Sequence, residues 1–138
     1  MQKRPSWPEY YLSIAKVVST RSTCERKQVG AVITDHRNRP ISFGYNEAPA
    51  GCPGCEGASI CAPQGKCDRT IHAELNAILH ADRNRLEGAT MYLTLSPCND
   101  CMKFLINAGI ERVFYSEQYR VPPSDYGRIL LIHHPMEY

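Results

Sequence analysis

The sequence predicts an α/β fold in which helices cover a central sheet. Short β-branched segments alternate along the chain with segments of helical periodicity. In the second half the order strand, helix, strand, helix, strand requires parallel pairing between strands. The 138 residues are enough for one domain with one hydrophobic core, and we expect residues 1–138 to form it.

The first half of the chain is expected to contain one helix and a hairpin. Ser6 and Glu9 have the spacing of a capping box, and the apolar residues after them recur at helical intervals, which predicts a helix over residues 8–21. Residues 30–34 and 40–45 are short and β-branched, with a polar turn between them.

A long loop is expected after this hairpin. Residues 46–69 are rich in Gly, Pro and Cys. Loops of this length inside a small domain are usually functional or held together by a metal.

The second half supplies the alternating elements. Residues 71–83 are helix formers with apolar side chains spaced for one buried face, and residues 89–95 are strand-like. A helix from about 98 to 108 follows Pro97, and residues 111–116 form another expected strand.

Composition limits the classes of function. A net charge of +2 is too small to indicate a duplex-binding surface, which usually shows a basic stripe. No apolar run approaches the roughly 18 to 20 residues that span a bilayer, and the first eight residues lack the apolar core of a signal peptide. We therefore expect a cytoplasmic protein with neither a nucleic-acid nor a membrane partner.

The seven cysteines are a high count for this length. Because no secretion signal is expected, the thiols should stay reduced, and an odd number does not fit a fully paired disulfide framework. The cysteines therefore indicate metal binding, with zinc as the expected ion.

Two short motifs carry the expected chemistry. His72 and Glu74 lie at one predicted helix start, and Cys98 and Cys101 lie at the next. Cysteines three apart on a helix project from one face, and a helix N-terminus favours the thiolate that binds zinc. His72 would supply a nitrogen ligand from the neighbouring helix.

Three protein ligands leave a fourth tetrahedral position for water, which is typical of a catalytic zinc. Zinc lowers the pKa of bound water from about 16 toward 7. Glu74 would take the water proton, pass it to ring N3 and later protonate the departing amine. The H-x-E and P-C-x-x-C pattern is the one described for zinc nucleobase deaminases. The alternative reading of Cys98 and Cys101 alone is a structural zinc knuckle.

The chain resembles the deoxycytidylate deaminases of the cytidine and deoxycytidylate deaminase family. The resemblance runs from about Trp7 to Tyr119 and is carried by segments 21–24, 29–33, 44–46, 70–78, 87–92, 96–98 and 107–110. It implies a cytidine deaminase-like three-layer α/β/α sandwich with a central mixed sheet. It also implies hydrolysis of dCMP to dUMP for dTMP synthesis by a homo-oligomer, commonly a hexamer.

The resemblance also implies a set of substrate-binding residues. The residue matching Asn46 holds the deoxyribose, and those matching Arg26 and Tyr119 lie at the phosphate end. Ser22 is a further phosphate candidate, and Ser96 positions the base. The complete substrate set is Ser22, Arg26, Asn46, Ala73, Ser96 and Tyr119. The alternatives are a solvated Arg26, a packing Tyr119 and a Ser96 that only shapes the turn before Pro97.

Relatives of this kind are often activated by dCTP and inhibited by dTTP, bound with Mg²⁺ near a glycine-containing loop. The matching residues here are Gly44, Asn46 and Gly51. Their glycines would let the backbone approach a triphosphate, or they simply form turns.

A second zinc site is expected among the remaining cysteines. The resemblance points to Cys24, Cys55, Cys61 and Cys67 as a closed four-thiolate structural site that would order the long loop, with Cys52 left over. The alternatives are a site in which Cys52 replaces one of these ligands, and reduced cysteines without a metal.

After Tyr119 the sequence departs from the resemblance. Only residues 129–132 look strand-like, so the last helix and strand are expected to be shortened. A compact chain of this kind suits a phage genome, in which case the location is the host cytoplasm. The competing interpretations are a deaminase of a nucleoside, of a riboflavin precursor or of nucleic acid, and, from another class, a non-catalytic zinc module that binds a partner.

Overall fold

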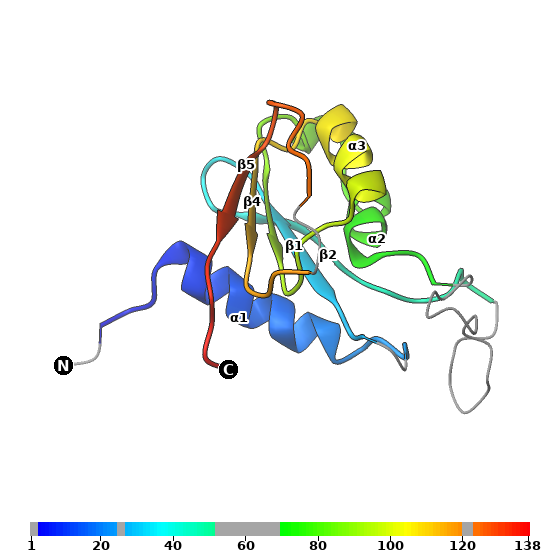
Figure 1. Cartoon of the computed structure of the whole chain (residues 1–138), viewed down its shortest axis with the longest axis horizontal. Coiled ribbons are helices and arrows are strands. Elements are labelled where there is room, and N and C mark those ends of the chain that lie inside the picture. The colour runs from blue at the N-terminus through cyan, green and yellow to red at the C-terminus, as the bar shows by residue number, and fades with distance from the viewer. Residues whose placement is uncertain (1–2, 25–26, 52–69, 120–122) are drawn as a thin grey trace.

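The structure is a computed structural model that describes residues 3–24, 27–51, 70–119 and 123–138. Within them a five-stranded sheet has the order β2-β1-β3-β4-β5 (Figure 1). The strands are β1 Gly30–Thr34, β2 Pro40–Tyr45, β3 Thr90–Leu93, β4 Arg112–Tyr115 and β5 Leu130–His133. β1 pairs antiparallel with β2 and β3, whereas β3 with β4 and β4 with β5 are parallel. The parallel pairing expected for the second half is confirmed.

Helices cover both faces of this mixed sheet. α1 (Trp7–Ser19) lies against one face, and α2 (Ala73–Leu79) and α3 (Asn99–Ala108) lie against the other (Figure 1). The predicted three-layer α/β/α sandwich is therefore confirmed. Among the described residues, no helix combines the length and apolar character needed to cross a bilayer.

α1 begins where the capping box predicts. The Glu9 amide donates to Ser6 Oγ at 3.3 Å, and the Ser6 amide donates to Glu9 Oε1 at 2.9 Å. These two bonds satisfy backbone donors that the first turn leaves without helical partners. Trp7 at the start of the helix stacks on Tyr11, with ring centroids 5.8 Å apart.

The two sheet faces are separated by the alternation of side chains along each strand. Val32 and Tyr92 are buried against Leu12 and Ala15 of α1. Other side chains of β1 and β3, together with side chains of β4, point to the opposite face and form the larger cluster with α2 and α3. The strand members of that cluster are Ala31, Ile33, Met91, Leu93, Val113 and Tyr115.

α2 packs tightly on β2. A Cβ atom at Gly44 would lie 2.3 Å from the Ala77 amide nitrogen, so only glycine fits this position of the strand. The Asn76 side-chain amide donates to the Tyr45 carbonyl at 2.8 Å and fixes the helix along the strand. Because His72 immediately precedes α2, this contact also positions the candidate ligand.

The expected helix over residues 71–83 is wrong in its extent. Ile71 is extended and exchanges two backbone hydrogen bonds with Glu47, at 2.8 and 3.2 Å, so the helix cannot begin before Ala73. At the other end His80 caps α2, and Asp82 starts a separate 3-10 turn, η1 (Arg83–Arg85). Both ends are set by contacts that helix periodicity does not report.

The last part of the chain is short, as expected. Between β4 and β5 the described residues 116–119 and 123–129 contain no α-helix, yet β5 still pairs in register with β4, Arg112 opposite Leu130. The strand lies one residue beyond the expected 129–132 span. Residue Tyr138 returns to α1, where its hydroxyl donates to the Leu12 carbonyl at 3.3 Å.

Candidate metal centre and active site

The predicted ligands lie where α2 and α3 begin. β3 ends at Leu93, and the chain then runs through Pro97 to Cys98, which is the N-cap of α3. His72 is the N-cap of α2, in an extended conformation. The carboxyl ends of parallel strands are the usual place for ligands in α/β sheets.

The three ligand atoms converge. The Nδ1 atom of His72 lies 3.2 Å from Cys101 Sγ and 3.6 Å from Cys98 Sγ. All three candidate donor atoms are within 4.8 Å of one another. The Cys101 amide donates to Cys98 Sγ at 3.5 Å, so the helix start itself orients this sulfur. The His72 side chain makes no capping bond to α2 and turns toward the sulfurs.

The three side chains of the cluster shift one another's pKa values. Hydrogen bonds from Cys101 and from His72 lower the pKa of Cys98 to about 3. The Cys98 thiolate in turn raises the pKa of the Cys101 thiol, to which burial also contributes. The same thiolate raises the pKa of His72. The lowered pKa of Cys98 favours its thiolate, which is the form of cysteine that binds a metal.

The donor set fits zinc. Two sulfurs and one imidazole nitrogen are typical zinc ligands, and tetrahedral zinc bond lengths place a nitrogen and a sulfur ligand roughly 3.6 Å apart. The two nitrogen–sulfur distances here are 3.2 and 3.6 Å. An ion bound by His72, Cys98 and Cys101 thus requires little rearrangement of the side chains.

Glu74 is a buried acidic residue beside this cluster. It lies two residues after His72 in the first turn of α2, with only 5% of its surface exposed. Burial raises the pKa of its carboxyl group, because a charged carboxylate is poorly solvated there. A carboxyl group with a raised pKa next to a metal site is suited to both accepting and donating a proton.

Comparison with known sequences decides the family. The sequence model of the cytidine and deoxycytidylate deaminase zinc-binding region matches residues 5–117. The chain belongs to the cytidine and deoxycytidylate deaminase family. In this family member the matched region includes all three candidate ligands and Glu74.

Proteins with similar sequences include deoxycytidylate deaminases from a phage and from human. The deoxycytidylate deaminase of Mycobacterium phage D29 is 43% identical over 129 residues, which cover 83% of this chain and 98% of that protein. The human deoxycytidylate deaminase is 38% identical over 118 residues, 82% of this chain and 66% of that protein.

A solved relative has the same fold. The crystal structure of dCMP deaminase from the cyanophage S-TIM5 in complex with dCMP and dUMP has a TM-score of 0.78 and 25% identity, covering 96% of this chain and 100% of that chain. The family assignment from sequence is confirmed.

Two predicted substrate residues brace the segment before β1. Asn46 is buried; its Oδ1 atom accepts from the Val29 amide at 2.8 Å, and its Nδ2 atom donates to the Lys27 carbonyl at 2.7 Å. Ser22 is also buried, and its hydroxyl donates to the Asn46 carbonyl at 2.7 Å. Both side chains thus hold residues 22, 27 and 29 against the end of β2.

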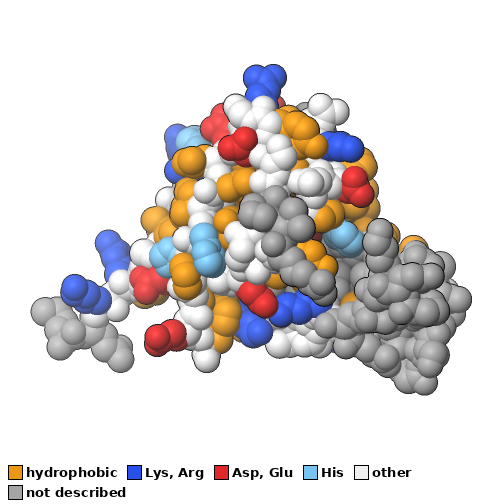
Figure 2. All heavy atoms as spheres, in the orientation of Figure 1, with side chains coloured by type: hydrophobic (Ala, Val, Ile, Leu, Met, Phe, Trp, Pro, Cys, Tyr) orange, Lys and Arg blue, Asp and Glu red, His pale blue; other side chains and the backbone are white. Residues whose placement is uncertain are grey.

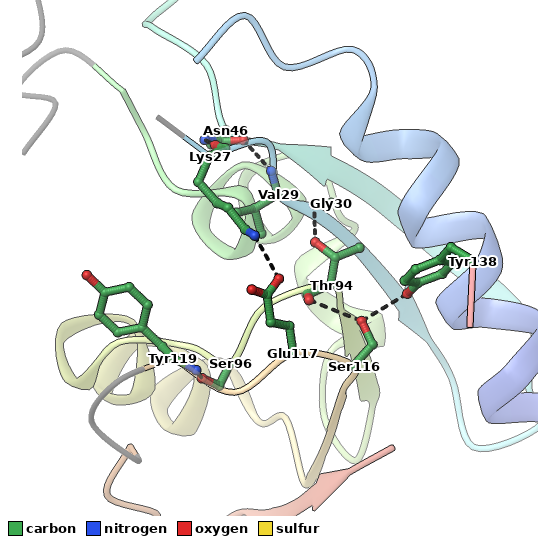
Figure 3. A network of polar contacts seen from close by, with 10 residues as sticks. All are labelled: Lys27, Val29, Gly30, Asn46, Thr94, Ser96, Ser116, Glu117, Tyr119 and Tyr138. Carbon is green, nitrogen blue, oxygen red and sulfur yellow. Dashed lines mark hydrogen bonds and ion pairs between the residues drawn. The ribbon is translucent and has the colours of Figure 1, made fainter. Parts of the chain in front are cut away.

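Two further predicted residues lie on the other side of the site. Ser96 is buried, and its Oγ atom accepts from the Tyr119 amide at 2.8 Å (Figure 3). The Tyr119 side chain is half exposed, and Figure 3 shows its ring pointing away from the Lys27–Glu117 pair. Ala73 is buried at the first position of α2, between His72 and Glu74.

Several predicted site residues are outside the described part of the chain. They are Arg26, Cys55, Cys61 and Cys67, and the left-over Cys52 is also outside it. Cys24 is described and is a half-buried free thiol.

The glycines of the expected effector loop have local explanations. Gly44 is not in a loop, because it lies within β2 against α2. Gly51 has φ of 81° with no atom near a would-be Cβ, which is typical of a turn.

Two features beside the carboxyl ends of β3 and β4, an ion pair and a cavity, were not predicted from the sequence. Lys27 Nζ lies 2.7 Å from Glu117 Oε2 (Figure 3). Both residues line a cavity of about 580 Å³. A charged residue two positions after a parallel strand, as Glu117 follows the last residue of β4, was the available signal.

Charged and apolar side chains are interspersed on the face seen in Figure 2, where no basic stripe is formed. This distribution agrees with the low net charge of +2.

Proposed function

We propose that this chain catalyses the hydrolytic deamination of dCMP to dUMP and ammonia, using zinc held by His72, Cys98 and Cys101. The observation that carries the proposal is the convergence of three donor atoms within 4.8 Å, two residues from the buried Glu74. Membership of the family and 43% identity to a phage deoxycytidylate deaminase support dCMP as the substrate.

The proposed reaction consumes one water and releases one ammonia. When bound, zinc supplies the Lewis acidity that makes water nucleophilic at neutral pH. The Glu74 carboxylate accepts a proton from the attacking water and donates it to ring N3 of cytosine. The same carboxylate then accepts the second proton from the hydroxyl group at C4 and passes it to the departing amine, so that the C4 carbonyl forms as ammonia leaves. Its burial supports this role, because the raised pKa lets it hold a proton between the two transfers.

The substrate-binding roles are part of the proposal. Asn46 would hold the deoxyribose, and its side-chain bonds to the Val29 and Lys27 backbones would fix its orientation. Ala73 and Ser96 would contact the base. The proposed phosphate-end residues are Ser22, Arg26 and Tyr119.

A substrate panel tests the function. The purified protein is incubated with dCMP, deoxycytidine, dCTP, a riboflavin-pathway aminopyrimidine and single-stranded DNA, and loss of the substrate's ultraviolet absorbance is followed. We expect the highest kcat/KM for dCMP. Faster turnover of another substrate would replace the proposal by one of the competing deaminase activities. No turnover of any substrate by zinc-loaded protein would favour the non-catalytic zinc module.

We also propose the four-thiolate structural zinc site of Cys24, Cys55, Cys61 and Cys67. Its support is the cysteine content of the chain and the half-buried free thiol of Cys24. Metal analysis of the unmutated protein then gives two zinc ions per chain, and Cys24→Ser gives one. One zinc per chain in both proteins would remove the second site.

Regulation, assembly and metabolic role are further parts of the proposal. We expect dCTP with Mg²⁺ to raise the rate on dCMP and dTTP to lower it, through the region of Gly44, Asn46 and Gly51. We expect a hexamer, which light scattering after size-exclusion chromatography would measure, and a cytoplasmic enzyme that supplies dUMP for dTMP synthesis. Rates that do not change with either triphosphate would remove the regulatory part alone.

A further inference from the structure

The ion pair between Lys27 and Glu117 joins the segment before β1 to the segment after β4. Lys27 lies before β1 and Glu117 lies after β4, and their charged atoms are 2.7 Å apart. Both side chains are about half exposed, 49% for Lys27 and 55% for Glu117, so a ligand from solution can reach them. Figure 3 shows the pair spanning from the Asn46 side to the Ser96 side.

Glu117 is fixed relative to one metal-ligand segment. Its backbone carbonyl accepts from the Ser96 amide at 2.8 Å. Ser96 is two residues before Cys98. The position of the Glu117 backbone is thereby set with respect to the start of α3.

Lys27 is fixed relative to the other metal-ligand segment. Its carbonyl accepts from Asn46 Nδ2 at 2.7 Å. Asn46 is followed by Glu47, whose backbone pairs with that of Ile71. Ile71 directly precedes the ligand His72. The two charges therefore project from backbones tied to the two sides of the His72–Cys98–Cys101 cluster.

The pair also lines the cavity of about 580 Å³, together with Thr94 and Ser116 at the ends of β3 and β4. Pockets of about 300 to 1,000 Å³ commonly hold small-molecule ligands. Of the two lysines in its lining, Lys16 lies over the Tyr138 ring, whereas Lys27 is held only by Glu117. Lys27 thus faces a space large enough for an anionic group, and none of the three metal ligands lines this cavity.

We propose that Lys27 binds the phosphate of the nucleotide substrate and that Glu117 holds the Lys27 ammonium group in the free enzyme. The inference rests on the proposed function and adds a residue that discriminates a nucleotide from a nucleoside. A phosphate monoester carries a charge of about −1.5 to −2 at neutral pH, more than one carboxylate. Because a half-exposed ion pair contributes little stability, the phosphate can replace Glu117 as the partner of Lys27.

Opposite effects of two substitutions test this exchange. Lys27→Gln should raise the KM for dCMP at least tenfold, with a smaller effect on kcat, and should weaken inhibition by dUMP in parallel. Glu117→Gln should lower the KM for dCMP twofold or more, because it removes the group that competes with the phosphate. If the pair is only structural, both substitutions loosen the same contact and both raise the KM, and that result would overturn the inference.

Lys16→Gln is the matched control. Lys16 lines the same cavity, but its ammonium group lies over the Tyr138 ring, 5.1 Å from the centroid. We expect its KM for dCMP to stay within twofold of the unmutated value. An equal rise in KM for Lys16→Gln and Lys27→Gln would mean that dCMP binding depends on the total positive charge near the cavity. A specific role of Lys27 would then be excluded.

Turnover of dCMP by the wild-type protein distinguishes a failure of the proposed function from a failure of the proposed role of Lys27. If it deaminates dCMP and the KM of Lys27→Gln is unchanged, the role of Lys27 fails while the proposed function stands. If zinc-loaded wild-type protein does not act on dCMP, the proposed function fails and the role of Lys27 fails with it. Thermal unfolding of each variant shows whether it is folded before its KM is compared.

Discussion

Gly44 of β2 and Ala73 of α2 lie so close that a Cβ atom at position 44 would be 2.5 Å from the Ala73 carbonyl oxygen. Ala73 directly follows His72 in the chain. Any outward displacement of α2 from the sheet is therefore transmitted at once to the candidate zinc ligand.

Gly44→Ala should consequently reduce both stability and zinc affinity. Overpacking of this kind typically costs about 1–3 kcal/mol of unfolding free energy. Chemical denaturation measures the loss, and competition with a chelator measures zinc affinity. Gly127→Ala is the control, because Gly127 has φ of 68° but no atom within 4 Å of a would-be Cβ. It should cost about 1–2 kcal/mol through its backbone conformation and leave zinc affinity unchanged. Equal zinc affinity in both variants would contradict the coupling.

Removal of a ligand should remove one metal ion. We expect His72→Ala, Cys98→Ser and Cys101→Ser each to lower the zinc content by about one ion per chain, since each takes away one of three protein ligands. Elemental analysis after gel filtration measures this content. His80→Ala serves as the control, because His80 caps the other end of the same helix and its Nδ1 atom contacts the Asn76 carbonyl at 2.7 Å. A full zinc content in the three ligand variants would disprove the site.

Glu74→Gln should abolish turnover while the metal stays bound. The amide keeps the shape of the side chain but cannot transfer the proton, and loss of a general acid–base group typically lowers the rate about 10²- to 10⁴-fold. The measurements are kcat on dCMP and zinc content of the same sample. The exposed Glu111 offers a matched substitution, Glu111→Gln, which should leave kcat unchanged. Near-normal turnover by Glu74→Gln would mean that another group moves the protons.

Asp35 should make stability depend on pH on the acid side. Its carboxylate accepts hydrogen bonds from the Arg39 and Arg37 amides and contacts Arg85, which lowers its pKa in the folded protein. Since the folded pKa lies below the unfolded value of about 4, the stabilisation is present above that pH and is lost as the pH falls toward the folded pKa. Asp35→Asn should therefore be less stable than wild type at pH 7, by a margin that shrinks on acidification. A margin that is the same at pH 7 and pH 3 would exclude this role.

Local signals in the sequence were sufficient for α1 and for the metal cluster. The capping box of Ser6 and Glu9 acts within one turn, so spacing alone reveals it. Cys98 and Cys101 are likewise placed by one helix start, and the sequence pattern for deaminases adds His72 and Glu74.

Contacts between distant segments could not be foreseen in the same way. The start of α2 is set by the pairing of Ile71 with Glu47, which helix periodicity does not register. Lys27 and Glu117 meet only because β1 and β4 flank β3 in the sheet, a neighbourhood that the order of elements does not specify. The packing of Gly44 on α2 is similar, since glycine has several possible roles in a strand.

The aromatic stack on α1 gives the protein an internal optical reporter. The chain has one tryptophan, Trp7, and its ring lies on Tyr11, which in turn contacts Tyr92 of β3. Intrinsic tryptophan emission will therefore follow the docking of the first helix on the sheet. Because the cluster of His72 and the two cysteines is on the opposite face, a fluorescence melting curve can remain unchanged while the metal layer loosens. Zinc release must therefore be measured separately from tryptophan fluorescence.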